Sequence, residues 1–188
     1  MELGWPVVSV AKKAAEGMSL TDCANHVCER LRTTRFIFAP ETLKFLEKGG
    51  RIGRASALLG NALHISPILT VKDGVASTYA KVRTQKKAMD KMVSILRQDI
   101  EAYGIRNIAV HYIGSKTPAD AWAESVIRPE FGSYIQVIPA SPVIGVHVGP
   151  AVGIAYECDR AISDKFTSTQ PEVVSAGIDA GLLKFVTA

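Results

Sequence analysis

The chain has 188 residues, of which 47% are hydrophobic and 21% charged, and it carries a net charge of +4. This length and composition are typical of one domain, or of one domain and part of another, with a substantial buried core. The apolar runs fall short of the roughly 20 residues that span a bilayer, and the opening sequence lacks the pattern of a signal peptide. Three cysteines at spacings unlike those of zinc or redox motifs indicate free thiols. We therefore expect a cytoplasmic protein without a membrane span.

The N-terminal quarter predicts helices around one short strand. The expected elements are helices at residues 7–17 and 19–33, a strand at 35–39 and a helix at 40–48. Gly17 separates the first two helices, and Ser19 is expected to cap the second. Pro40 is expected in the first turn of the helix that follows the strand, where its missing amide hydrogen is not needed.

The rest of the chain alternates strands and helices. The expected elements are a short helix at 54–64, strands at 65–71 and 75–84 around a Lys-Asp-Gly turn, the longest helix at 84–103, a strand at 105–114, a helix at 118–127 and a strand at 133–141. Residues 143–157 mix four glycine or proline residues with apolar ones, and His147 is expected to lie on a loop there. The polar start of 163–188 indicates a linker and a weak helix. This order predicts a layered α/β domain with a mixed sheet.

Two adjacent glycines, Gly49 and Gly50, interrupt the apolar pattern, and Arg51 follows them directly. One interpretation is a helix C-cap, in which glycine adopts the left-handed conformation and a basic residue lies near the negative end of the helix. The other interpretation is that the break presents the arginine to a ligand. The motif alone leaves both open.

Among the four histidines, His147 has the most unusual surroundings. Gly145 precedes it and Gly149 and Pro150 follow it, so the backbone can turn tightly there or approach a ligand. A histidine in such a loop can donate a hydrogen bond to a carboxylate or phosphate near neutral pH. The histidines and cysteines lack the spacing of metal ligands, and we expect no metal site and no cofactor.

Basic residues are concentrated in the middle of the chain. Residues 44–97 contain eleven lysines and arginines and three acids, a local net charge of +8. This bias indicates an anionic ligand or an acidic partner, or a solvated lysine-rich face. A nucleic-acid-binding module is one alternative, although aromatic residues make up only 7% of the chain. A small hydrolase or transferase using His147 and Ser141 is another, although no third group that would orient the histidine is evident.

Three segments in one colinear order carry a resemblance to a known family. They are LEKGGRIGRASALLGNALHISPILTVKDG at 46–74, AKVRTQKKAMDKM at 80–92 and SPVIGVHVGPAVGIAY at 141–156. With them, residues 1–160 resemble the second half of the bacterial DegV proteins. The resemblance implies a long-chain fatty acid held between two α/β domains. It also implies a carrier that presents the carboxylate to an ATP-binding fatty acid kinase subunit and is not itself an enzyme, with no nucleic acid as a partner.

The resemblance also implies roles for individual residues. Arg51, after Gly50, matches an arginine near the head group of the ligand, and a guanidinium suits a carboxylate or acyl phosphate. His147 matches the histidine of an H-x-G-P loop, whose glycine is Gly149. Arg83 matches an arginine of the kinase-facing surface, where Lys86 and Lys87 add charge. The apolar residues Leu58, Leu59, Leu63, Ile65 and Ile68 are candidates for part of the acyl tunnel.

Two motifs of the first DegV domain, T-S-Q-P-S and S-S-x-S-G-T-Y, do not occur in the chain, and we interpret TSTQP at 167–171 as a coincidence. The expected organisation is therefore a remnant of the first domain at 1–48, the second domain at 49–162 and an atypical tail at 163–188. A chain that supplies one wall of the tunnel is expected to bind fatty acid weakly or not at all. Its exposed apolar wall is expected to promote self-association.

Overall fold

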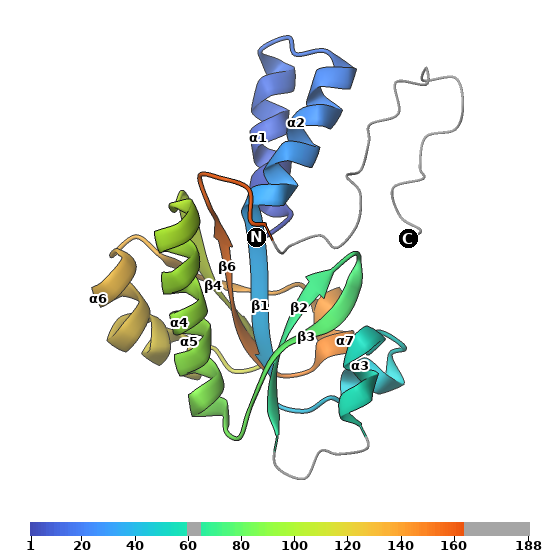
Figure 1. Ribbon diagram of the computed structural model, residues 1–188, viewed down its shortest axis with the longest axis vertical. Coiled ribbons are helices and arrows are strands. Elements are labelled where there is room, and N and C mark those ends of the chain that lie inside the picture. The colour runs from blue at the N-terminus through green and yellow to red at the C-terminus, as the bar shows by residue number, and fades with distance from the viewer. Residues whose placement is uncertain (60–64, 164–188) are drawn as a thin grey trace.

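The computed structural model describes residues 1–59 and 65–163, and Figure 1 shows how their elements are arranged. In this part of the chain, six strands form one mixed sheet in the order β3-β2-β1-β6-β4-β5. The strands are β1 (Thr34–Pro40), β2 (Ser66–Lys72), β3 (Val75–Val82), β4 (Asn107–Ile113), β5 (Gln136–Pro139) and β6 (Ala151–Glu157). Within this sheet β4 and β5 are parallel, and the other neighbours are antiparallel. The predicted layered α/β fold is confirmed.

Helices cover the two faces of the sheet unequally (Figure 1). One face carries α4 (Gln85–Tyr103), α5 (Thr117–Trp122), the π-helical turn η2 (Ala123–Ile127) and α6 (Arg128–Phe131). The other face carries the shorter α3 (Lys44–Lys48), the 3-10 helix η1 (Gly53–Leu58) and α7 (Pro142–Val148). Helices α1 (Gly4–Ala15) and α2 (Leu20–Thr33) pair with each other and extend beyond the end of the sheet. None of the helices described here is long and apolar enough to cross a bilayer.

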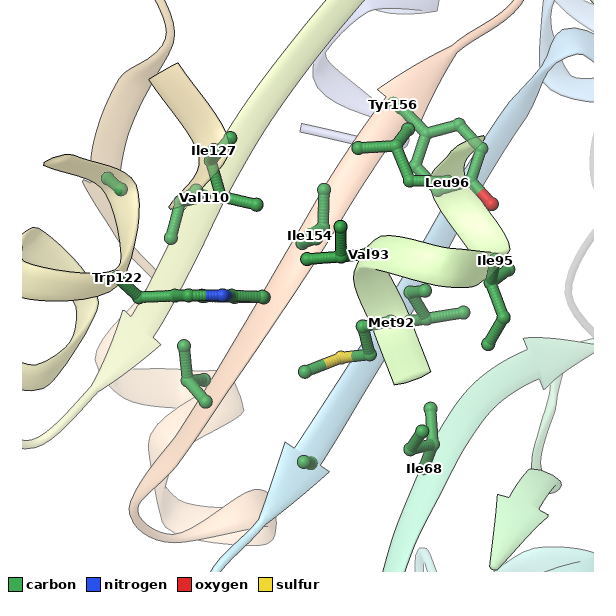
Figure 2. Close-up of a cluster of buried hydrophobic side chains, with 14 of the residues drawn as sticks. Ile68, Met92, Val93, Ile95, Leu96, Val110, Trp122, Ile127, Ile154 and Tyr156 are labelled. Atoms are coloured by element: carbon green, nitrogen blue, oxygen red, sulfur yellow. The ribbon is translucent and has the colours of Figure 1, made fainter. Parts of the chain in front are cut away.

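Alternating side chains of the strands produce two apolar cores. In β1, Ile37 and Ala39 belong to the larger core with α4, whereas Phe38 belongs to the smaller core on the other face, with Phe36 packed against it. Figure 2 shows the larger core, in which the labelled buried side chains are Ile68, Met92, Val93, Ile95, Leu96, Val110, Trp122, Ile127, Ile154 and Tyr156. This core holds α4 and α5 against the sheet.

A buried carboxylate joins the α1–α2 hairpin to the sheet. Glu157, at the end of β6, is fully buried. It pairs with Arg30 of α2 at 2.5 Å and accepts a hydrogen bond from the Asn107 side-chain amide at 2.7 Å. A buried charge is tolerated only when such partners compensate the loss of hydration. The hairpin is therefore fixed to the sheet at the C-terminal end of α2.

A second polar cluster lies between α4 and the sheet. The Tyr156 hydroxyl donates to Asp99 at 2.6 Å, and the Arg35 Nε atom lies 3.3 Å from the same carboxylate oxygen. The guanidinium of Arg35 lies over the Tyr79 ring, 5.0 Å from its centroid. Burial raises the pKa of Tyr156, so its hydroxyl stays protonated and remains a donor.

The predicted hairpin and the predicted long helix are confirmed. Strands β2 and β3 are joined by Asp73 and Gly74, both with positive φ, as a tight hairpin turn requires. Helix α4 begins at Gln85, after Thr84, whose hydroxyl accepts a hydrogen bond from the Lys87 amide. Local turn and cap chemistry therefore determines these two elements.

The predicted helix start at Pro40 is wrong. Pro40 is the last residue of β1, where it lies opposite Ala151, and α3 begins only at Lys44. Pairing with β6 extends the strand through a residue that the local pattern assigns to a helix. The predicted helix at 54–64 is a 3-10 helix that ends at Leu58, and residues 60–64 lie outside the described part of the chain.

The loop expected around His147 is also wrong, because His147 lies in α7. Ser141 caps α7 by accepting a hydrogen bond from the Ile144 amide, and Pro142 occupies the first turn of this helix. The following residues form β6, a central strand that pairs with β1 on one side and β4 on the other. Gly145 therefore lies in α7, Gly149 directly follows this helix, and Gly153 lies in β6.

The expected boundary between residues 48 and 49 runs through the sheet. Strand β1 precedes this boundary, yet it pairs with β2 and β6, which follow it. In the structure, β1 and α3 are thus part of the same layered unit as the rest of the sheet. Of the expected tail at 163–188, residues 164–188 lie outside the described part of the chain.

Candidate ligand-binding cavity

The face of the sheet opposite α4 carries a cavity of about 590 Å³. Strands β1, β4 and β6 line its floor, α7 lines one side, and residues 1–4 reach its rim. Most of its lining is apolar and includes Phe36, Phe38, Ile113, Val143, Ile144 and Val148. Its volume lies within the range of roughly 300–1,000 Å³ that is typical of small-molecule sites. The least covered face of the sheet is thus also the face that can hold an apolar ligand.

A glycine in the central strand shapes the floor of this cavity. Gly153 of β6 lies between Phe38 on one neighbouring strand and His111 on the other. A Cβ atom at Gly153 would lie 2.7 Å from the Ile37 carbonyl oxygen, 2.8 Å from the Cβ atom of Phe38 and 3.0 Å from the ring of Phe36. Phe36 and Phe38 stack with their centroids 5.1 Å apart. The glycine therefore makes room for two aromatic rings that form an apolar floor.

His147 lies in the last turn of α7 and lines the cavity. Its Nδ1 atom is buried without a hydrogen-bond partner among the described residues. A Cβ atom at Gly49 would lie 2.5 Å from this nitrogen, which is too close for any side chain. Gly49, at the end of α3, is therefore the glycine that makes room for the imidazole ring.

Gly50 has a different role from its neighbour. Its φ of +66° places it in the left-handed region, and a Cβ atom there would meet nothing within 4 Å. It redirects the chain after α3, so that Arg51 follows at the edge of the cavity. The Nη1 atom of Arg51 donates to the Gly49 carbonyl at 3.1 Å. The double glycine thus ends α3, as the first interpretation expects. It also leads to an arginine that lines a cavity, which the second interpretation requires.

Gly149 follows α7 with a φ of +69°. A Cβ atom at this position would overlap the ring of Phe45 in α3. The glycine therefore allows α3 and α7 to pack closely, which brings Arg51 and His147 to the same cavity. Sequence patterns gave no signal for Phe45, whose role depends on this contact between two short helices.

His111 adds a second imidazole to the cavity, on its floor. Its Nδ1 atom lies 3.1 Å from the Ile138 carbonyl, and its Nε2 atom lies 2.8 Å from the Met1 amino group. Burial, and then the charge of the Met1 amino group, lower the pKa of His111 to about 4. The ring is therefore neutral at pH 7, with a proton on Nδ1, since a carbonyl can only accept, and a lone pair on Nε2.

A family model described as "Uncharacterised protein, DegV family" matches residues 1–159. The chain belongs to the DegV family. A DegV domain-containing protein of Clostridium acetobutylicum is 44% identical over 161 residues, which are 85% of this chain and 56% of that protein. This DegV chain thus spans about half the length of the curated relatives that it matches.

Solved DegV structures share the fold. A DegV family protein from Thermus thermophilus, whose structure is described as showing fatty acid binding, has a TM-score of 0.71 and 30% identity, over 84% of this chain and 57% of that one. A fatty acid binding DegV family protein from Streptococcus agalactiae has a TM-score of 0.73 and 25% identity, over 82% and 55% of the two chains.

The basic residues expected to face a partner lie away from the cavity of this DegV chain. Arg83, Lys86 and Lys87 are exposed where β3 ends and α4 begins, and none of them lines the cavity. The structure therefore separates two groups of expected site residues, with Arg51 and His147 at the cavity and the basic strip elsewhere.

The geometry does not favour a hydrolase that uses His147 and Ser141. These residues lie at opposite ends of α7, and six residues of helix separate them by about 9 Å along its axis. The Ser141 hydroxyl caps the helix instead. Among the described residues, no group of three or more histidine, cysteine or acidic side chains could hold a metal ion.

The candidates for the acyl tunnel do not line this cavity. Ile68 faces the larger core with α4, and Leu58 is buried in the smaller core. Leu59 and Ile65 are absent from the cavity lining, and Leu63 lies outside the described residues. Phe36 and Phe38 of β1 line the cavity instead. Their position there follows from the pairing of β1 with β6, which the sequence pattern does not show.

Proposed function

We propose that this chain is a fatty-acid-binding carrier and that its cavity holds part of the acyl chain of a long-chain fatty acid. The observation that carries this proposal is the apolar cavity of about 590 Å³ with Arg51 and His147 at its edge. An acyl chain needs an apolar channel, and its carboxylate needs donors at one end. Fatty acid binding by the similar Thermus and Streptococcus proteins supports the same ligand class.

The carboxylate of the ligand would lie between Arg51 and His147. Arg51 is exposed and can form charge-assisted hydrogen bonds with a carboxylate. His147 provides ring nitrogens, one of which has no partner in the described structure. We infer that Gly50 and Gly149 act indirectly, by directing the backbone that carries these two side chains.

The apolar part of the ligand would lie on the floor formed by Phe36, Phe38 and Gly153. Each buried CH₂ group stabilises the complex by about 0.8 kcal/mol, but only where protein covers the acyl chain on both sides. The described residues form one wall of this cavity, and we expect a ligand held by that wall alone to bind more weakly than a ligand enclosed on both sides. An apolar wall that is exposed to solvent would also favour self-association.

The basic strip formed by Arg83, Lys86 and Lys87 would bind an ATP-binding kinase subunit that phosphorylates the carboxylate. We expect Arg83→Glu to weaken association with such a partner about ten-fold and to leave fatty-acid affinity unchanged, because exposed charges mainly affect association with a charged partner. Surface plasmon resonance at two salt concentrations measures the effect. Lys12→Glu, with the same change of charge on α1, is the control. A parallel loss of fatty-acid binding would place Arg83 in the ligand site.

Fatty-acid titration tests the main proposal. We expect palmitate to bind the chain and Arg51→Leu to lower its affinity about ten-fold, the typical effect of losing one charge-assisted hydrogen bond. Arg54→Leu is the matched control, because Arg54 pairs with Asp73 and does not line the cavity. Equal affinities of the Arg51→Leu and Arg54→Leu variants would contradict the assignment of the head-group end.

A further inference from the structure

The polar side chain of His111 lies on the floor of the cavity, where a purely apolar ligand could not form a hydrogen bond with it. His111 is 7% exposed and lies in β4, directly opposite Gly153 of β6. The ring of Phe36 meets it edge to face, with centroids 5.8 Å apart. An imidazole surrounded by aromatic and small residues is an unusual floor for a saturated acyl chain, because a chain that displaced the Met1 nitrogen would leave Nε2 buried without a partner.

The hydrogen bonds of His111 determine what it offers to a ligand. The Ile138 carbonyl binds Nδ1, and it must accept a proton from this nitrogen. Nε2 is therefore an acceptor. The Met1 amino group lies 2.8 Å from it, which shows that a hydrogen-bond donor fits at this point of the cavity.

His111 lies away from the proposed head-group end. A Cβ atom at Gly145 of α7 would lie 3.4 Å from the Ile113 side chain, so α7 packs over Ile113. His111 precedes Ile113 by two residues, which places it about 7 Å farther along β4. A ligand group that reaches Nε2 therefore belongs to the acyl chain beyond its first carbons.

We propose that His111 Nε2 accepts a hydrogen bond from a hydroxyl group on the acyl chain, so that the cavity takes hydroxylated fatty acids. This inference rests on the proposed function, since it concerns the same cavity. The ligand hydroxyl takes the position at Nε2 that the Met1 nitrogen occupies in this structure. A carbonyl or ether oxygen on the chain does not suit the position, because two acceptors cannot pair.

The test uses the chain labelled with ¹⁵N-histidine and a series of hydroxydodecanoic acids, with the hydroxyl moved from the α to the ω position. Dodecanoic acid is the parent compound. We expect at least one member with the hydroxyl beyond the α position to shift the Nε2 resonance of His111 and to bind at least as tightly as the parent. The α-hydroxy acid is the matched control and is expected to leave this resonance unchanged.

A variant separates hydrogen bonding from packing. In His111→Leu we expect the favoured hydroxy acid to bind at least ten-fold more weakly than the parent, because its hydroxyl is buried without a partner. His111→Gln, which keeps an acceptor, is expected to restore part of the preference. Even if both variants fail to fold, the shift of the Nε2 resonance in the unmodified chain still tests whether a ligand hydroxyl binds His111.

The outcomes distinguish the two proposals. If dodecanoic acid binds in the cavity but no hydroxy acid shifts Nε2 or matches its affinity, the role of His111 is wrong and the proposed function stands. If neither the parent nor any hydroxy acid perturbs the residues of the cavity, both proposals are wrong.

Discussion

At the scale of single residues, the two histidines of the cavity differ in their surroundings. His147 lies at the end of a short helix, with one nitrogen buried against the backbone of α3. His111 lies in the sheet with both nitrogens engaged. Of these two, sequence patterns marked His147, because glycines surround it. His111 lies in an apolar strand like any core histidine, and its position in the cavity follows from the pairing of β4 with β6.

The lowered pKa of His111 predicts a pH dependence of stability. Its pKa falls from 6.5 to about 4 on folding, so protons bind preferentially to the unfolded chain. The contribution of neutral His111 to the free energy of unfolding is fully present above pH 6.5 and is lost as the pH falls toward 4. We expect the free energy of unfolding to decrease across this window by up to about 3 kcal/mol.

Urea denaturation at a series of pH values measures this decrease. His111→Leu is the comparison, because it removes the imidazole while the carboxylates that titrate in the same window remain. The two unfolding free energies are expected to differ in their slope between pH 4 and 6.5. Identical slopes would show that His111 is not buried as the structure places it.

At the scale of elements, the sequence predicts those whose signals are local and misses those that depend on distant partners. The Asp-Gly turn and the capped helix α4 follow from neighbouring residues. Helix α7 and strand β6 do not, because glycine and proline resemble loop signals when they are considered alone. Gly153 lies in a strand at a point where a Cβ atom would clash with Ile37, Phe38 and Phe36, which come more than a hundred residues earlier.

The end of α3 gives a prediction in which adjacent glycines have opposite effects. Gly49 has a helical φ of −79° but touches His147, whereas Gly50 has a φ of +66° and open space around it. We expect Gly49→Ala to displace His147 and weaken fatty-acid binding several-fold with little loss of stability. Gly50→Ala is expected to lower the free energy of unfolding by about 1 kcal/mol, through strain in the left-handed conformation. Its effect on binding is expected to be smaller than that of Gly49→Ala, because the added Cβ atom meets nothing and the backbone can keep the path that carries Arg51.

Fatty-acid titration and urea denaturation of both variants separate these effects. Each variant serves as the control for the other, since both add one methyl group at neighbouring positions. A stability loss in Gly49→Ala with unchanged affinity would show that its contact with His147 does not matter for the ligand.

At the scale of the whole molecule, the described helices close one face of the sheet and leave a cavity on the other. The larger core fills the α4 face, while the opposite face has a cavity and exposed apolar residues on α7, such as Val143 at 73% and Val146 at 70%. Exposed apolar side chains gathered around a cavity indicate a surface that binds something. The chain spans about half the length of the curated relatives that it matches.

Photo-crosslinking of an acyl chain tests this account most directly. A fatty acid with a diazirine near its ω end is irradiated with the chain, and the labelled peptides are identified by mass spectrometry with and without excess palmitate. We predict labelling of β1, β6 and α7 that palmitate suppresses, because these elements line the cavity. Labelling of α4 and α5, or labelling that palmitate does not suppress, would contradict the claim that the cavity face of the sheet is the acyl site.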